Sequence, residues 1–191
     1  MTRRDEQKEK SHEEILRSAM GLLRQRGIGG ASVGDVMRGA GLTVGGFYAH
    51  FASKEALVAE ALRRTMRDQW ETMLSGLDGL PVGVKVRRLA GRYLSSKHLD
   101  AERSCPMPAV LSELPAQGDE VRASFADVFE GNARQIADVL GDDEIDRALA
   151  LVVVMVGGLA LTKALRGHPL EERVRRAAKA AAARLVDEGE G

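Results

Sequence analysis

Residues 32–55 read SVGDVMRGAGLTVGGFYAHFASKE, and this stretch decides the fold. Two short helical segments, 33–39 and 44–51, flank a break at residues 40–42. Gly41 lies in the break and supplies the permissive backbone that a sharp corner between two helices needs. The pattern predicts a helix-turn-helix.

Capping residues and apolar spacing support both helices. Ser32 precedes the first helix and Asp35 follows three residues later, which is the pattern of a capping box. Thr43 stands where the second helix needs an N-cap, and we expect its hydroxyl to bond an N–H there. Apolar residues lie on one side of each helix; they are Val33, Val36 and Met37 in the first helix and Val44, Phe47 and Phe51 in the second.

The outer face of the second helix suits a nucleic-acid surface. Gly45, Gly46 and Ala49 carry little bulk, so the backbone can approach another surface closely. Tyr48 and His50 provide polar side chains beside them. The sequence therefore predicts a recognition element for DNA.

Three groups of residues in this region resemble the TetR/AcrR family of bacterial transcriptional repressors. They are Ala-Gly-Leu-Thr at 40–43, Phe-Tyr-Ala-His-Phe at 47–51, and Ser-Lys-Glu at 53–55. The resemblance covers roughly residues 11–62. It implies an N-terminal three-helix DNA-binding head. The chain departs from the family at Val44, often a basic residue, and at Met37, usually a small one.

The chain is predicted to divide into a DNA-binding head, residues 1–53, and a regulatory and dimerisation bundle, residues 54–191. We expect residues 1–10 to be unstructured, either as an arm that reaches into the minor groove or as a solvated tail. The predicted DNA-binding residues are Arg3, Arg4, Ser32, Thr43, Val44, Gly45, Gly46, Tyr48, His50 and Lys54.

Composition is that of an ordinary globular protein. The 191 residues include 28 Lys and Arg and 28 Asp and Glu, so the formal net charge is zero. Residues 1–54 hold nine basic and six acidic residues, a net of +3 that suits a local DNA-binding surface. One cysteine fits a reducing cytoplasm. The N-terminus lacks a signal peptide, and the apolar run 148–161 is too short to span a membrane.

The remaining sequence predicts helices and no strands, so the fold class is all-α. Beyond a first helix that starts at Ser11 and ends at Gly27, apolar spacing indicates helices at 54–77, about 86–94, 109–114, 121–140, 143–165 and 169–186. Glycines within the helix 143–165 suggest that another backbone packs closely against it.

The resemblance implies that the last two long helices form a four-helix dimer interface; alternatively, they close the core of the monomer. The predicted interface residues are Val154, Gly157, Gly158, Leu161, Val174, Ala178, Ala181 and Leu185. A two-fold dimer would hold two recognition elements about 34 Å or more apart, on a palindromic operator.

Motifs of enzymes are missing from the sequence, and no cofactor or metal site is predicted. The histidines are scattered, and we expect His98 to be a surface or loop residue. Cys105 follows Arg103, and a nearby cation or helix N-terminus lowers a thiol pKa. The segment Cys105-Pro106 resembles a TetR subgroup whose cysteine senses oxidants or electrophiles. The alternative is a small buried cysteine without a special role.

The sequence thus predicts a cytoplasmic, homodimeric repressor that binds double-stranded operator DNA. A small apolar inducer, or an electrophile that modifies Cys105, would release it. The predicted inducer pocket is formed by Trp70, Met73, Tyr93, Cys105, Met107, Leu111, Phe125, Phe129 and Met155. Two other hypotheses remain: a small thiol enzyme, although no His or Asp partner for Cys105 is identifiable, and a helical adaptor that binds only protein.

Overall fold

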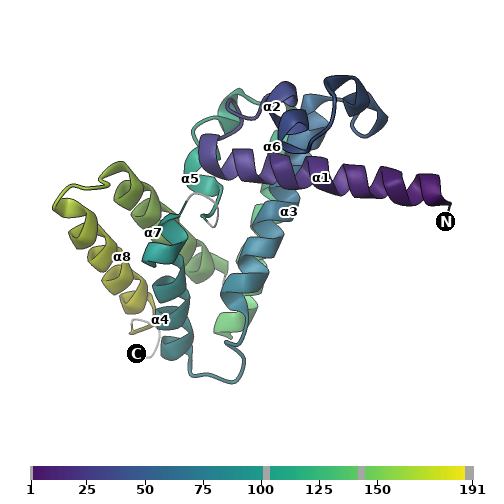
Figure 1. The fold of residues 1–191 in the computed structure, drawn as a ribbon. Helices are drawn as coiled ribbons and strands as arrows, with labels where there is room; N and C mark the ends of the chain where they lie inside the picture. The colour runs from purple at the N-terminus through teal and green to yellow at the C-terminus, as the bar shows by residue number, and fades with distance from the viewer. Residues whose placement is uncertain (1, 101–103, 142–144, 188–191) are drawn as a thin grey trace.

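The computed structural model describes residues 2–100, 104–141 and 145–187, and within them the chain is helical without strands (Figure 1). The predicted all-α class is confirmed. The elements are α1 (Arg3–Arg26), α2 (Val33–Gly39), η1 (Val44–Ala49), α3 (Lys54–Leu74), α4 (Val82–Tyr93), η2 (Ser96–Leu99), α5 (Met107–Val110), η3 (Leu114–Ala116), α6 (Asp119–Leu140), α7 (Ile145–Ala164) and α8 (Leu170–Asp187), where η denotes a 3-10 helix.

Helix α1 begins eight residues earlier than predicted, so the expected unstructured arm is wrong. Thr2 forms a capping box with Asp5: the Thr2 side chain accepts from the Asp5 N–H, and the Asp5 carboxylate accepts from the Thr2 N–H. Acidic Asp5 and Glu6 in the first turn also favour the helix dipole. Ser11, the predicted start, is buried inside the helix. The first turns of α1 project from the body of the molecule (Figure 1).

The first of two apolar cores lies in the N-terminal head. The apolar side of α1 is buried there against α2, η1 and the first half of α3, and Val110, Leu114 and Val121 from α5, η3 and α6 complete this core. The core residues from these elements include Ile15, Leu16, Leu23, Val36, Met37, Phe47, Leu57 and Leu62. Their burial holds the short α2 and η1, which could not be stable alone.

The second core joins α4, α6, α7 and α8 to the second half of α3. Trp70 on α3 stacks on Tyr93 of α4, with ring centroids 5.6 Å apart. Both rings are fully buried, together with Met66, Leu89 and Met155. Figure 1 shows α4, α7 and α8 on one side of the long α3.

Helix α3 belongs to both cores. Leu57 and Leu62 lie in the first core, whereas Met66 and Trp70 lie in the second. Helix α6 packs along α3, and the Ser124 hydroxyl donates to the carbonyl oxygen of Ala59 at 3.0 Å. A domain boundary between residues 53 and 54 stays a prediction, because α3 contributes to the packing on both sides of it.

Helices α7 and α8 pack closely where the sequence predicted close packing. A Cβ atom at Gly158 would lie 2.5 Å from the Cβ atom of Ala178 on α8. Only glycine allows this approach. By length and composition α7 could cross a membrane, but a core helix of a water-soluble protein has the same properties.

The segment 106–117 differs from the single short helix predicted at 109–114. It forms α5 and η3, with prolines at the start of each. Between them, Glu113 reaches the loop after α1: its carboxylate accepts from the N–H groups of Ile28 at 3.0 Å and Gly29 at 2.6 Å. This contact, which we name the Glu113 clasp, ties the head to the bundle. The acidic run 142–144, predicted to open the next helix, lies outside the described residues.

The clasp predicts a stability effect. Glu113→Ala removes two charge-assisted hydrogen bonds, so we expect the free energy of unfolding to fall by about 1–3 kcal/mol. Urea unfolding followed by circular dichroism measures it, with Glu71→Ala as the matched control, since Glu71 is exposed on α3. An equal, small effect of both substitutions would show that the clasp contributes nothing.

Candidate nucleic-acid interface

The turn between α2 and η1 has the geometry of a helix-turn-helix. The Ser32 hydroxyl caps α2 and bonds Asp35, as predicted. Gly41 adopts φ +70°, a left-handed conformation that side chains rarely adopt. The Leu42 N–H then bonds the carbonyl oxygen of Met37 at 2.9 Å. The corner is therefore fixed by the backbone itself.

The recognition element is a 3-10 helix, Val44–Ala49, rather than the α-helix predicted over 44–51. Two adjacent glycines, Gly45 and Gly46, disfavour an α-helix, and six residues are short enough for the tighter form. The predicted cap is also wrong: Thr43 takes the N-cap position but makes no side-chain capping bond. Buried Phe47 anchors the element, stacked on Phe51 at 5.8 Å.

Four of the predicted DNA-binding residues form one accessible face at η1. Tyr48 is 76% exposed and Val44 is 53% exposed. Thr43 and Gly45 are exposed beside them, and no neighbouring atom lies within 4 Å of a Cβ position at Gly45. We name these four residues the η1 face. Gly46 is half-buried below it.

His50 and Lys54 are less free than the η1 face. The Lys54 ammonium donates to the carbonyl oxygen of Ile28 at 3.3 Å. His50 is half-buried, and burial, followed by nearby His12 and Lys8, lowers its pKa. His12 stacks on Phe51 at 4.6 Å, and its Nε2 lies 3.1 Å from Glu60. The stacking of His12 on Phe51 thus supports the second half of the helix-turn-helix.

Arg3 and Arg4 are exposed on the first turn of α1. Ser32 is also exposed, at the start of α2. The N-terminal end of α1 and the segment from α2 to η1 lie at the end of the molecule farthest from α8 (Figure 1). The predicted DNA-binding residues therefore belong to one end of the molecule; their contacts with DNA stay a prediction.

Comparison with known proteins identifies this motif. Residues 15–61 match the family model described as bacterial regulatory proteins, tetR family. Residues 15–61 are therefore a DNA-binding segment of the TetR type. The match covers α1 from Ile15 through the first turns of α3.

Similar proteins include two curated mycobacterial repressors. The chain is 30% identical over 109 residues to the HTH-type transcriptional repressor DhaR of Mycobacterium sp. (strain GP1), which covers 57% of this chain and 54% of that protein. It is 44% identical over 50 residues to KstR2 of Mycobacterium tuberculosis, which covers 26% of this chain and 25% of that protein. The chain thus spans about half of DhaR and a quarter of KstR2.

Solved TetR-family structures share the whole fold. Reduced NemR of E. coli superposes with a TM-score of 0.72 at 19% identity, covering 88% of this chain and 95% of that chain. SCO4454 of Streptomyces coelicolor gives 0.71 at 18% identity, covering 94% and 96%. The all-α fold, with its helix-turn-helix head, is therefore that of TetR-family regulators.

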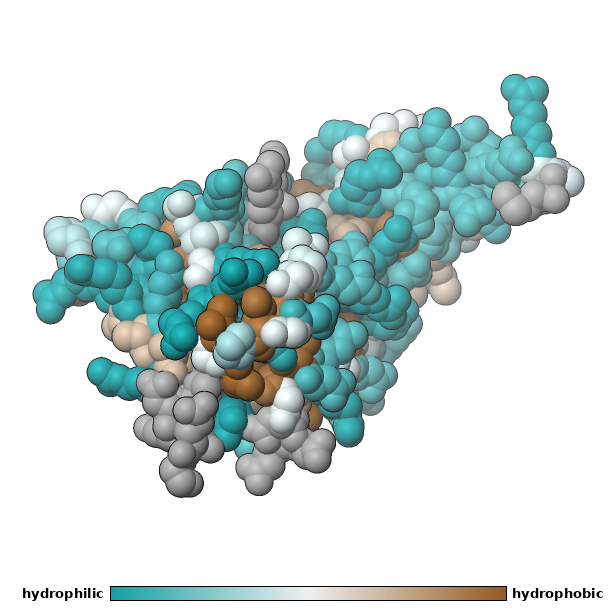
Figure 2. Space-filling view, turned by 90° about the horizontal axis from the view of Figure 1, so that it is seen from below, coloured by the Kyte–Doolittle hydropathy of each residue, from teal (hydrophilic) through white to brown (hydrophobic). Residues whose placement is uncertain are grey.

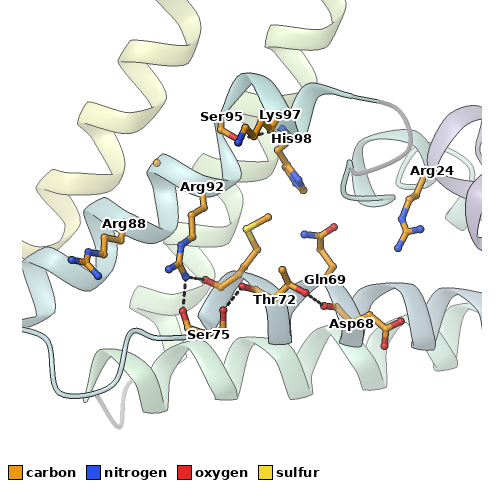
Figure 3. Close-up of a pocket in the computed structure, with 12 residues that line it drawn as sticks. Arg24, Asp68, Gln69, Thr72, Ser75, Arg88, Arg92, Ser95, Lys97 and His98 are labelled. Atoms are coloured by element: carbon orange, nitrogen blue, oxygen red, sulfur yellow. Dashed lines mark hydrogen bonds between the residues drawn. The ribbon is translucent and has the colours of Figure 1, made fainter.

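The residues predicted to line an inducer pocket instead fill the second core. Trp70, Tyr93, Cys105, Met107 and Met155 are fully buried. Phe125 and Phe129 are half-buried and stacked on each other, and Leu111 is 41% exposed at the end of α5. Large apolar side chains gain most from close packing, which leaves polar residues to line open space. Met73 alone of this set lines the cleft of about 890 Å³ between α3 and α4 (Figure 3).

Cys105 is not the activated thiol that its sequence neighbours suggested. It is fully buried, and burial raises its pKa; the Tyr93 side chain, the Met107 amide, Lys163 and Arg24 oppose that shift only in part. Its backbone N–H donates to Nε2 of His98 at 3.2 Å. His98 is itself buried, so its predicted surface position is wrong. Arg103 lies outside the described residues.

Helix α7 exposes an apolar stripe at helical spacing. Val153 is 68% exposed and Leu161 57%, with Gly157 exposed between them. Val154 of α7, and Val174, Ala178, Ala181 and Leu185 of α8, are half-buried. Gly158 packs against α8 within the chain, so a side chain there would disturb that packing first. Apolar residues also gather on the underside of the molecule, where Figure 2 shows a brown patch among hydrophilic residues. Val153 was not predicted.

A substitution at Tyr48 is expected to lower DNA affinity while leaving the stability of the fold nearly unchanged. Because its side chain is exposed, Tyr48→Ala should change the free energy of unfolding by less than about 0.5 kcal/mol. DNA affinity should fall about tenfold or more, since the ring is the largest exposed side chain on the η1 face. Fluorescence anisotropy with bound genomic DNA measures it. Leu170→Ala, at an exposed leucine on α8, is the control; equal effects of the two variants would contradict the assignment.

The buried Cys105 should resist labelling. We expect 5,5′-dithiobis-(2-nitrobenzoic acid) to react with the folded protein at least about a hundredfold more slowly than with the urea-unfolded chain, because reaction needs both opening and a thiolate. Absorbance at constant pH follows the reaction. Equal rates in the two states would show that the thiol is reachable in the native fold.

Proposed function

We propose that this protein is a homodimeric transcriptional repressor that binds a palindromic operator through two copies of the η1 face. The exposed η1 face on a TetR-family helix-turn-helix carries this proposal. DhaR and KstR2, whose sequences match around this motif, are both HTH-type transcriptional repressors. A regulator of this kind binds DNA and performs no catalysis, and buried Cys105 is a poor nucleophile for a thiol enzyme.

The η1 face suits contact with DNA by shape more than by charge. Gly45 leaves its backbone open to close approach, and the Tyr48 hydroxyl can bond a phosphate. Val44 offers an apolar contact for the methyl group of thymine in the major groove. The basic residues that add phosphate contacts are Arg3, Arg4 and Lys54.

Release would require the two recognition elements to move apart or tilt. Helix α3 lies in both cores, so a change in the packing of Trp70 or Met73 displaces the head. An inducer shifts the population only if it binds the released conformer more tightly than the DNA-binding one. Modification of Cys105 would act in the same place, but burial requires the core to open first.

Selection of bound fragments from the native genome tests DNA binding. The expected result is a small set of fragments that share an inverted repeat, with half-sites about 34 Å apart or more. Affinity should fall linearly on a log–log plot against salt concentration. An absence of sequence enrichment, or an affinity independent of salt, would favour the protein-binding adaptor instead.

The exposed stripe on α7 predicts the dimer seam. Leu161→Glu and Val153→Glu place a charge where two apolar surfaces should meet, and burial of an unpaired charge costs several kcal/mol. We expect both variants to become monomeric in sedimentation velocity runs and to lose operator affinity. Leu111→Glu, at an exposed leucine outside the stripe, is the matched control. Dimers that persist in both variants would place the seam elsewhere.

A further inference from the structure

A cleft of about 890 Å³ lies between α3 and α4, and α1 and η2 contribute further lining residues (Figure 3). Its volume is in the range of sites for small organic ligands. Its lining is mostly polar. The lining residues are Arg24, Asp68, Gln69, Thr72, Met73, Ser75, Arg88, Gly91, Arg92, Ser95, Lys97 and His98.

The cleft concentrates positive charge in a chain whose formal net charge is zero. Four of its lining residues are cations, Arg24, Arg88, Arg92 and Lys97, and one is a carboxylate, Asp68. The balance is therefore 4 − 1 = +3. His98 Nε2 accepts a hydrogen bond from the Cys105 N–H and is not counted in this balance. Low-dielectric walls strengthen the field of such a cluster on a bound ion.

Arg92 is already committed to the fold. Its guanidinium donates to the carbonyl oxygens of Met73 at 2.8 Å and Ser75 at 2.7 Å, which closes the C-terminal end of α3. Figure 3 shows both bonds and shows Arg88 directed away from the centre of the cleft. The cations that remain for a ligand are therefore Arg24 and Lys97.

Arg24 carries a hydrogen-bond donor that lacks an acceptor in the described part of the chain. Its Nε is buried and has no hydrogen-bond partner among the described residues. Burial lowers the pKa of Arg24, and nearby Asp68 offsets that effect only in part. Gln69 is a largely buried residue that also lines the cleft. Both side chains point into the cleft in Figure 3. A buried donor without an acceptor is costly, and an oxyanion would satisfy the Arg24 Nε–H while the Gln69 amide could donate to the same ligand.

We propose that this cleft binds a small organic anion, with its carboxylate or phosphate group held by Arg24, Gln69 and Lys97. An inorganic ion would leave most of the volume empty, so the remainder of the ligand extends along Met73 and Gly91. This inference rests on the proposed function only for its regulatory consequence. It replaces an apolar inducer in the core with an anionic one in the cleft.

The position of Arg24 gives the anion a route to the DNA-binding head. Arg24 lies on α1, three residues before Gly27, whereas Lys97 and Gln69 belong to the bundle side. An anion bound between them therefore links α1 to η2 and α3. The conformer in which these groups close on the ligand differs from the ligand-free one in the position of α1, and thus of η1.

Titration of the free protein with four six-carbon probes tests binding. The probes are hexanoate, hexyl phosphate, hexanol and hexylamine, measured by calorimetry at constant ionic strength. We expect at least one anion to bind about tenfold or more tightly than the neutral and cationic probes. The preferred anion tells carboxylate from phosphate. Equal binding of hexanol, or no binding of either anion at millimolar concentration, would overturn the proposal.

Variants locate the site. Arg24→Gln should weaken the anion about tenfold, and Lys97→Gln, at an exposed residue, about threefold. Arg173→Gln, at an exposed arginine on α8, is the matched control and should bind as the wild type does. If Arg24→Gln fails to fold, Lys97→Gln decides the matter by itself. Wild-type affinity in Lys97→Gln and in any folded Arg24→Gln protein would refute the site.

The regulatory step is measured separately, with genomic DNA fragments that the protein retains. The anion that binds should lower DNA affinity in the wild type and leave Lys97→Gln less responsive. If the protein retains no DNA, the proposed function fails, whereas the titration of free protein still decides whether the cleft binds anions. If DNA binding is intact and the bound anion leaves it unchanged, the regulatory part is wrong.

Discussion

Helix α3 belongs to both apolar cores, and this sharing sets how the head and the bundle are joined. One continuous helix buries Leu57 and Leu62 in the head and Met66 and Trp70 in the bundle. Each fully buried side chain of this kind contributes about 1.5–3 kcal/mol. Loss of the α3 residues from either core would cost several kcal/mol of burial free energy. Helix α3 therefore joins the two cores as a continuous rod. Helix α6 packs along the same rod and stiffens it.

The head is also held against the bundle, because Val110, Leu114 and Val121 from α5, η3 and α6 complete the first core. The Glu113 clasp holds the loop after α1, and Arg24 at the end of α1 faces the cleft. Both act on the same end of the same helix. The orientation of η1 therefore depends on this apolar packing together with the polar contacts at the C-terminal end of α1.

The helix-turn-helix could be predicted because its capping and turn residues are neighbours in the sequence. The cleft could not, because its lining residues come from separate elements. Val33–Gly39 was predicted to the residue because Ser32 caps it and Gly41 ends it. The start of α1 differs from the prediction because Thr2–Asp5 and Ser11–Glu14 carry similar capping patterns, and the helix begins at the first of them, before its residues pack on the head. The glycines of η1 predict close approach to DNA, but they also disfavour the α-helix, and the element is a 3-10 helix. Arg24, Arg92 and Lys97 lie in separate elements, so no spacing could reveal that they share a cleft.

Side chains suited to an apolar pocket are the same ones that fill a core, and here packing decides between the two roles. Trp70 and Tyr93 stack on each other, and the Tyr93 ring lies 4.8 Å from that of His98. The cleft that the core leaves open is lined by polar groups, and the Arg24 Nε–H among them is buried without a hydrogen-bond acceptor in the part of the chain that the structure describes. Because a buried donor without an acceptor is costly, the open space between α3 and α4 favours a ligand that carries acceptor oxygens. The chemistry of the ligand thus follows from the residues that the core leaves out.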